Sequence, residues 1–73
     1  MLSARNQFRG TVVSVKHGAV MSEVVIEIGN GFEIVSLIST SSAKRLKLKR
    51  GKSAVAVIKA TEVIVSTDEA DRG

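Results

Sequence analysis

A strong hairpin signal constrains the fold of this chain more than any other feature of its sequence. The turn tripeptide Gly29-Asn30-Gly31 separates two runs of β-branched residues. Glycine and asparagine adopt positive φ at low cost, so this tripeptide predicts a tight turn between two antiparallel strands. The run before the turn alternates Val24, Ile26 and Ile28 with Glu23 and Glu27. Such alternation is typical of a strand with one apolar face and one solvated face.

The rest of the chain repeats this strand signal. The predicted strands are Phe8–His17, Val20–Ile28, Phe32–Ser39, Ala54–Ile58 and Glu62–Ser66. The alternation changes phase at Val12-Val13, which predicts a β-bulge or strong coiling of the strand. The hydroxyls of residues 40–42 can cap a helical turn over residues 43–46. Five short strands, with one short helical turn between the third and fourth, predict an all-β fold: an OB-like antiparallel β-barrel. We expect Leu46 and Leu48 to plug its open end.

At 73 residues the chain has room for one domain, and we expect a single domain over residues 1–73 with a frayed tail at 67–73. It has no cysteine, no tryptophan and only two phenylalanines, both of which we expect in the core. A core this thin predicts an oligomer. The chain starts without an apolar leader and contains no long apolar run, which predicts a cytoplasmic protein with no membrane contact.

Positive charge is concentrated in one segment. Six of the eleven cations lie within nine residues: Lys44, Arg45, Lys47, Lys49, Arg50 and Lys52. The rest of the chain contains five cations and seven carboxylates. The chain is therefore mildly acidic apart from one basic run, Lys44–Lys52. A small basic barrel could bind single-stranded nucleic acid or another polyanion. Because such proteins stack bases on aromatic side chains, the near absence of aromatics disfavours nucleic acid as a partner.

Few residues here could support catalysis. The single histidine, His17, has no local Ser/Asp partner, and Glu23 and Glu27 fit a solvated strand face. No His, Cys or carboxylate spacing indicates a metal-cation site. We therefore expect a protein that is not an enzyme and uses no metal cation and no organic cofactor.

Two short segments supply hydrogen-bond donors without any carboxylate. They are Ser3-Ala4-Arg5-Asn6, before the first strand, and Lys59-Ala60-Thr61, between the last two. A fully deprotonated tetrahedral oxyanion accepts hydrogen bonds at every oxygen and donates none. The residue types in these segments suit that ligand.

Four motifs in order make the sequence similar to a known family. They are Ser-Ala-Arg-Asn-Gln at 3–7, Gly-Ala-Val at 18–20 followed by Glu-Val-Val-Ile-Glu at 23–27, Ile-Ser-Thr-Ser-Ser at 38–42, and Ile-Lys-Ala-Thr at 58–61. Over about residues 2 to 66 the chain resembles the molbindin (Mop) family of molybdate-binding domains. The resemblance implies an OB-like barrel assembled as a homohexamer, a trimer of dimers, with oxyanions bound at subunit interfaces.

The resemblance also implies two types of oxyanion site. The first type would use Ser3, Ala4, Arg5, Asn6, Ser39, Lys59, Ala60 and Thr61. The second type would use the small-residue loop His17, Gly18, Ala19 and Val20, whose backbone N–H groups can approach an anion closely. We expect Arg5 and Lys59 to reach one site from opposite ends of the fold, in different subunits.

The resemblance therefore implies intracellular storage or buffering of molybdate and tungstate. A polyanion-binding barrel is the first alternative. A structural oligomerisation module that no longer binds a ligand is the second.

Overall fold

The computed structural model describes residues 5–68. The predictions for Ser3 and Ala4, and most of the predicted tail 67–73, lie outside these residues. The elements are β1 (Asn6–His17), β2 (Met21–Gly29), β3 (Phe32–Ser39), α1 (Thr40–Arg45), β4 (Ser53–Ile58) and the short 3₁₀ helix η1 (Ala60–Glu62). Within residues 5–68, the helices are too short to cross a membrane.

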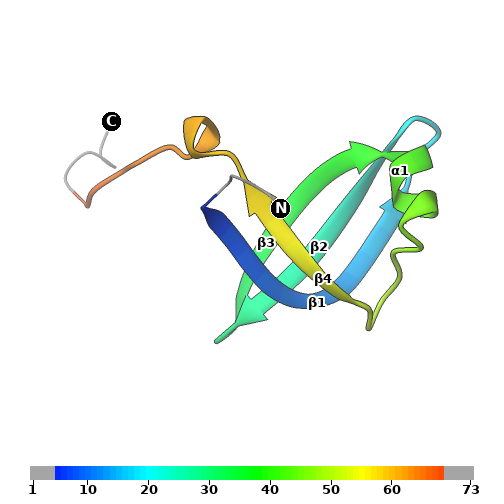
Figure 1. The fold of residues 1–73 in the computed structure, drawn as a ribbon, viewed down its shortest axis with the longest axis horizontal. Coiled ribbons are helices and arrows are strands. Elements are labelled where there is room, and N and C mark those ends of the chain that lie inside the picture. The colour runs from blue at the N-terminus through cyan, green and yellow to red at the C-terminus, as the bar shows by residue number, and fades with distance from the viewer. Residues whose placement is uncertain (1–4, 69–73) are drawn as a thin grey trace.

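The four strands form one antiparallel sheet in the order β3-β2-β1-β4 (Figure 1). β1 curls the sheet because its two halves pair with different strands. Residues 6–11 of β1 pair with β4, and residues 11–17 pair with β2. The predicted β-bulge is confirmed, since the β1–β2 register shifts between Val12 and Ser14. At Gly10, an added Cβ would lie 2.1 Å from the carbonyl oxygen of Glu27, so the bend brings the two backbones into direct contact.

The predicted hairpin is confirmed, and it joins β2 to β3. Gly29, Asn30 and Gly31 have φ values of 114°, 56° and 80°, the region that favours glycine and asparagine. The alternation in β2 also places its apolar residues on the buried face, as predicted. Val24 and Ile26 belong to the core cluster, together with Val12 and Ala56. Leu48 packs against this cluster as expected, whereas Leu46 is half exposed.

The helix after β3 begins earlier than predicted. Ser39 is its N-cap: the Ser39 hydroxyl accepts a hydrogen bond from the Ser42 N–H at 3.1 Å. Residues 40–42 were expected to cap a helical turn at 43–46, but they form the first turn of α1 instead. The reason is that a serine at the end of a strand already has the extended backbone that an N-cap needs.

The prediction of a fifth strand at Glu62–Ser66 is wrong for the single chain. Glu62 lies in η1, and residues 63–66 have no regular structure. The chain turns at η1 and runs away from the sheet, so residues 63–66 reach neither free edge, β3 or β4 (Figure 1). The fold is therefore a mostly β, four-stranded half-barrel. Ile64 and Val65 are 92% and 85% exposed as a result.

The expectation that both phenylalanines lie in the core is also wrong. Phe8 is 40% exposed and Phe32 is 67% exposed. Phe8 pairs with Ala56 across β1 and β4, and Phe32 pairs with Gly29 at the hairpin. The core cluster consists of small aliphatic side chains: Val12, Val24, Ile26 and Ala56.

Candidate functional site

The two donor segments of the first-type site lie side by side in one chain. Asn6 pairs with Ile58 in the β1–β4 ladder. Continuing this antiparallel register places Arg5 beside Lys59. Within one chain the two cations therefore lie at the same end of the fold rather than at opposite ends. That they reach one site from different subunits stays a prediction. Antiparallel pairing of the first and last strands brings the start of one to the end of the other.

The segment after β4 presents unused donors. Lys59 caps η1, and its carbonyl accepts from the Glu62 N–H at 2.8 Å. The first N–H groups of any helix have no partner within the helix. Within residues 5–68, no hydrogen bond uses the N–H of Ala60 or Thr61, and neither Arg5 nor Lys59 forms an ion pair. Arg5, Lys59, Ala60 and Thr61 are exposed and Asn6 is half-buried, so these donors face solvent at the edge of the sheet.

Ser39 is not part of this group in the single chain. It ends β3 next to α1, at the opposite end of the half-barrel from η1 (Figure 1). Its hydroxyl already forms two hydrogen bonds within the chain. It accepts from the Ser42 N–H as the cap of α1 and donates to the Ser42 hydroxyl at 2.8 Å. Ser39 can join a site with Lys59 only if it comes from another copy of the chain.

The second predicted loop, residues 17–20, is tied to the start of α1. The Gly18 N–H donates to the Met21 carbonyl at 2.9 Å, so this N–H is used inside the turn. Two hydrogen bonds from Thr40 connect the loop to α1. Its N–H donates to the Val20 carbonyl at 2.7 Å, and its hydroxyl donates to the Gly18 carbonyl at 2.7 Å. A Cβ at position 18 would lie 2.4 Å from the Met21 carbonyl oxygen, which explains the glycine.

Sequence reasoning missed two polar residues at this loop. Ser22 and Thr40 are buried, and their hydroxyl oxygens lie 2.8 Å apart. Ser22 also lies 3.1 Å from Nδ1 of His17. The signal was available in β2, where Ser22 continues the inward-facing series of Val24 and Ile26 and is its only polar member. A buried hydroxyl requires hydrogen-bond partners, and this pattern could have prompted a search for them.

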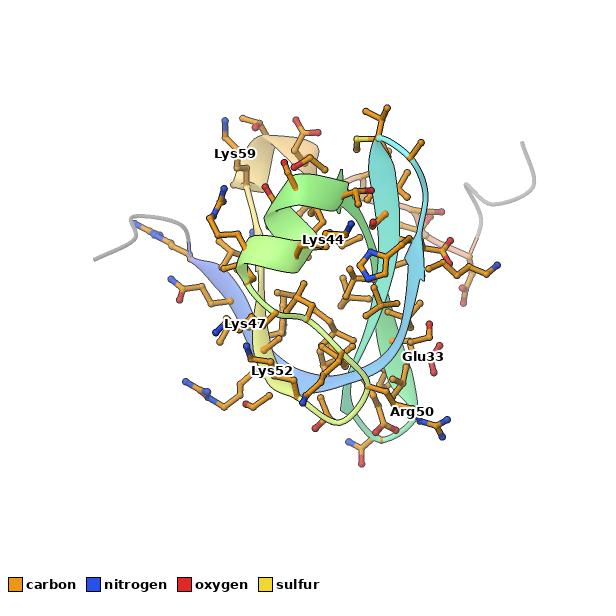
Figure 2. All side chains as sticks on the ribbon, turned by 90° about the vertical axis from the view of Figure 1, so that its right-hand side faces the viewer. Glu33, Lys44, Lys47, Arg50, Lys52 and Lys59 are labelled. Atoms are coloured by element: carbon orange, nitrogen blue, oxygen red, sulfur yellow. The ribbon has the colours of Figure 1, made fainter. Side chains whose placement is uncertain are left out.

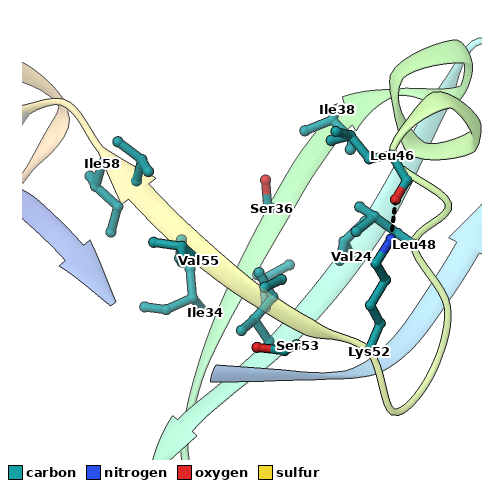
Figure 3. A pocket seen from close by; sticks show the side chains of 15 residues that line it. Val24, Ile34, Ser36, Ile38, Leu46, Leu48, Lys52, Ser53, Val55 and Ile58 are labelled. Atoms are coloured by element: carbon teal, nitrogen blue, oxygen red, sulfur yellow. Dashed lines mark hydrogen bonds between the residues drawn. The ribbon is translucent and has the colours of Figure 1, made fainter. Parts of the chain in front are cut away.

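An apolar groove of about 640 Å³ opens between the two edge strands, β3 and β4 (Figure 3). Ile34 and Ile38 of β3 line one side, and Val55 and Ile58 of β4 line the other. The one cation in its wall is Lys52, whose Nζ donates to the Leu46 carbonyl at 2.6 Å. Apolar walls cannot replace the hydration of a dianion, so the groove is unsuited to an oxyanion.

The basic run surrounds α1 and the loop that follows it. Figure 2 shows Lys44, Lys47, Arg50 and Lys52 spread around this end of the molecule rather than directed at one point. Among residues 5–68 none of these cations forms an ion pair. The same part of the chain contains no group of three His, Cys, Asp or Glu side chains that could hold a metal ion.

The half-barrel and its exposed donor segments have the form expected of a small anion-binding module. The family comparison agrees, because the family model described as the TOBE domain matches residues 2–65. The chain belongs to the TOBE-domain family, among its small molybdenum-pterin-binding (Mop) proteins.

Several relatives support this assignment. The chain is 47% identical over 64 residues to molybdenum-pterin-binding protein 1 of Clostridium pasteurianum, covering 88% of this chain and 94% of the relative. It is 46% identical over 67 residues to a probable molybdenum-pterin-binding protein of Haemophilus influenzae, covering 92% and 97%. The molybdenum transport protein ModE of Herbaspirillum seropedicae is 43% identical, but the match covers only 24% of that longer protein.

Solved structures agree with the fold. MopII from Clostridium pasteurianum has a TM-score of 0.87 at 45% identity, covering 92% of this chain and 100% of that one. A molybdate-binding protein from Sporomusa ovata has a TM-score of 0.86 at 34% identity, covering 92% and 98%. The cytoplasmic molybdate-binding protein ModG, solved with molybdate bound, has a TM-score of 0.78 at 47% identity, covering 81% and 42%.

Proposed function

We propose that this chain is a single-domain protein that binds molybdate, and also tungstate, for storage or buffering in the cytoplasm. The observation that carries the proposal is the pairing of Asn6 with Ile58, which sets Arg5 and Lys59 at the ends of two adjacent strands. The N–H groups of Ala60 and Thr61 lie in the same segment, and no hydrogen bond of the described residues uses them. This group offers two positive charges and several donors, but no carboxylate. The names of the relatives describe molybdenum-pterin-binding and molybdate-binding proteins, and ModG was solved with molybdate. The protein binds its ligand without catalysing a reaction.

The site is completed by self-association. Ser39 has to come from a second copy to meet Lys59, and Ser3 and Ala4 extend the donor segment that ends at Arg5 and Asn6. We assign the oligomer as a homohexamer built as a trimer of dimers, with the second-type site at His17–Val20 where loops from several copies meet. Exposed apolar side chains on the outer sheet face, including Val35 at 61% and Leu37 at 67%, support association.

The fifth strand of the barrel forms in this oligomer. Residues 62–66 of one copy occupy the groove between β3 and β4 of another, where both edge strands have free backbone groups. The groove is apolar, and Val63, Ile64 and Val65 are the exposed apolar residues that match it. Burying each such side chain contributes roughly 1.5–3 kcal/mol. This exchange closes the half-barrel into the five-stranded OB-like form.

Calorimetric titration with molybdate, tungstate, sulfate and phosphate tests the ligand. We expect phosphate to bind most weakly of the four, because it carries at least one proton at neutral pH and the first-type site has no carboxylate to accept a hydrogen bond from that proton. Molybdate and tungstate should bind with saturable heat. Phosphate binding comparable to molybdate binding would contradict the donor-only site. Equilibrium dialysis without any oxyanion uptake would instead support a structural module.

The basic run provides the test of the polyanion alternative. Reversing the charge at Lys47, Lys49 and Arg50 together should change molybdate affinity by less than about threefold, since these exposed cations act only through screened long-range attraction. The same variant should lose any salt-sensitive binding of single-stranded oligonucleotide, measured by fluorescence anisotropy. A large loss of molybdate affinity would place the basic run in the oxyanion site.

A further inference from the structure

A buried hydrogen-bond chain joins α1 to an exposed imidazole at the end of β1. The Thr40 hydroxyl donates to the Gly18 carbonyl at 2.7 Å. The Ser22 hydroxyl lies 2.8 Å from the Thr40 hydroxyl, and Nδ1 of His17 lies 3.1 Å from the Ser22 hydroxyl. Ser22 is 1% exposed and Thr40 is 8% exposed, whereas the histidine is exposed to solvent. The chain therefore runs from the interior to the surface.

The direction of every proton in this chain follows from its inner end. A carbonyl only accepts, so the single hydroxyl proton of Thr40 is committed to Gly18. Ser22 must then donate to Thr40, which commits its own single proton. Nδ1 of His17 must in turn donate to Ser22. The neutral His17 ring thus carries its proton on Nδ1 and a lone pair on Nε2.

This tautomer decides what the ring can offer to an anion. In the neutral ring, Nε2 is an acceptor, and a fully deprotonated oxyanion is also only an acceptor, so the two repel. Protonation of the ring places an N–H on Nε2 and adds a positive charge. The ring then becomes a charge-assisted donor. Imidazole is the side chain whose protonation ordinarily changes between pH 5 and 8.

Backbone donors lie next to the ring in the same loop. The C=O and N–H of a trans peptide unit point in opposite directions. The Gly18 carbonyl points to Thr40, so the Ala19 N–H points away from α1. Within residues 5–68, no hydrogen bond uses the N–H of Ala19 or of Val20. The loop can therefore contribute donors beside the imidazole.

We propose that His17 binds the oxyanion of the second-type site, through the ligand's oxygen atoms, only as an imidazolium, so that each dianion bound there takes up one proton. The inference rests on the proposed function and adds a proton linkage to that site. It also makes affinity at this loop rise as pH falls, while the Arg5–Lys59 site has no such dependence.

The charged groups around His17 leave the bound dianion as its main counter-charge. Lys16 precedes it on β1. On β2, Glu23 stands opposite Lys16 and Ser22 stands opposite His17 in the strand register. The ionisable residues of α1 are both cations, Lys44 and Arg45. In the part of the chain that the structure describes, His17 forms no ion pair with a carboxylate.

Because the chain has one histidine, ¹⁵N NMR of the imidazole tests this proposal on the intact protein. At high pH we expect the neutral ring to be protonated at Nδ1. Saturating molybdate should raise the pH midpoint of the ring titration by about one unit, the shift that corresponds to a tenfold preference for the protonated form. Calorimetry at pH 7 in two buffers of different ionisation enthalpy should show proton uptake on binding.

Two variants separate the ring from its surroundings. His17→Gln keeps a neutral donor but cannot titrate, so proton uptake should disappear while molybdate still binds at the Arg5–Lys59 site. Lys16→Gln removes a neighbouring charge and should leave proton uptake unchanged. Ser22→Ala removes the acceptor for Nδ1 and should abolish the preference for the Nδ1–H tautomer.

Opposite results have distinct meanings. A neutral ring protonated at Nε2 would overturn the tautomer assignment. A midpoint that saturating molybdate does not move, or proton uptake that persists in His17→Gln, would overturn the proton linkage while leaving the proposed function intact. Absence of molybdate binding from pH 5.5 to 8.5 would overturn the proposed function and this inference together.

Discussion

Replacing Arg5 or Lys59 by alanine should weaken molybdate binding at the first-type site by about tenfold to a hundredfold. Hydrogen bonds to charged groups are worth roughly 1.5–3 kcal/mol, and 1.4 kcal/mol corresponds to a factor of ten. The antiparallel register places both cations just beyond the adjacent ends of β1 and β4, so one dianion can contact both. Calorimetric titration of each variant measures the loss. Arg9→Ala removes an exposed cation from β1, the strand that follows Arg5, and is the matched control, expected to change affinity little.

The two substitutions should also be coupled. Because one oxyanion contacts both groups, the double variant should lose less than the product of the single losses, and a double-mutant cycle measures this. Without ligand, neighbouring cations repel, so each variant should be as stable as the parent or slightly more stable. Its stabilisation by added molybdate should be smaller. If Lys59→Ala dissociates the empty oligomer while the remaining protein binds molybdate normally, Lys59 is structural and the site assignment is wrong.

Ile64→Asp should convert the oligomer largely to monomer. Ile64 is 92% exposed in the single chain and, in the proposed exchange, enters the apolar groove of a second copy. An unpaired carboxylate in that groove would lose its hydration without compensation. Light scattering should then give a mass near that of one 7.7 kDa chain, whereas the parent should give about six times this value. Molybdate binding that needs a second copy should be lost with the oligomer.

Asn30→Asp is the control for Ile64→Asp. It adds the same charge at the exposed hairpin tip, where the positive φ of 56° suits aspartate, and should leave the oligomer intact. An Ile64→Asp protein that keeps the parent mass would show that residues 62–66 do not join the copies. A parent chain that is a well-folded monomer at micromolar concentration would contradict the oligomer itself.

The local elements could be predicted from the sequence because each depends on neighbouring residues. The Gly29–Gly31 turn follows from backbone preferences, and the buried face of β2 follows from its alternation. The bulge at Val12-Val13 was visible as a change of phase. The α1 boundary was predicted less well, because several adjacent hydroxyls could serve as the cap and only the backbone at Ser39 distinguishes them.

Contacts between distant parts of the chain could not be predicted in the same way. Residues 62–66 include the β-branched types that favour a strand. A strand also needs a neighbouring strand to pair with, and the turn at η1 directs these residues away from the edges of their own sheet. The core position expected for Phe8 and Phe32 failed for a similar reason. Apolar character marks a residue for burial without saying where the tertiary structure places it: Phe32 lies beside the hairpin turn, and Phe8 lies near the start of β1.

The sequence by itself determined the strands, the turn and the residue types of the donor segments, since these depend on conformational preference and chemistry within a few residues. Only the tertiary structure decided that Arg5 stands beside Lys59 in one chain, because that proximity comes from pairing β1 with β4 across some fifty residues. The tertiary structure also decided which ring nitrogen of neutral His17 carries the proton in our inference. The series of hydrogen bonds from Thr40 through Ser22 exists only when α1 packs against the loop between β1 and β2. Pairing register and hydrogen-bond direction are properties of positions in space, and no local pattern of residues encodes them.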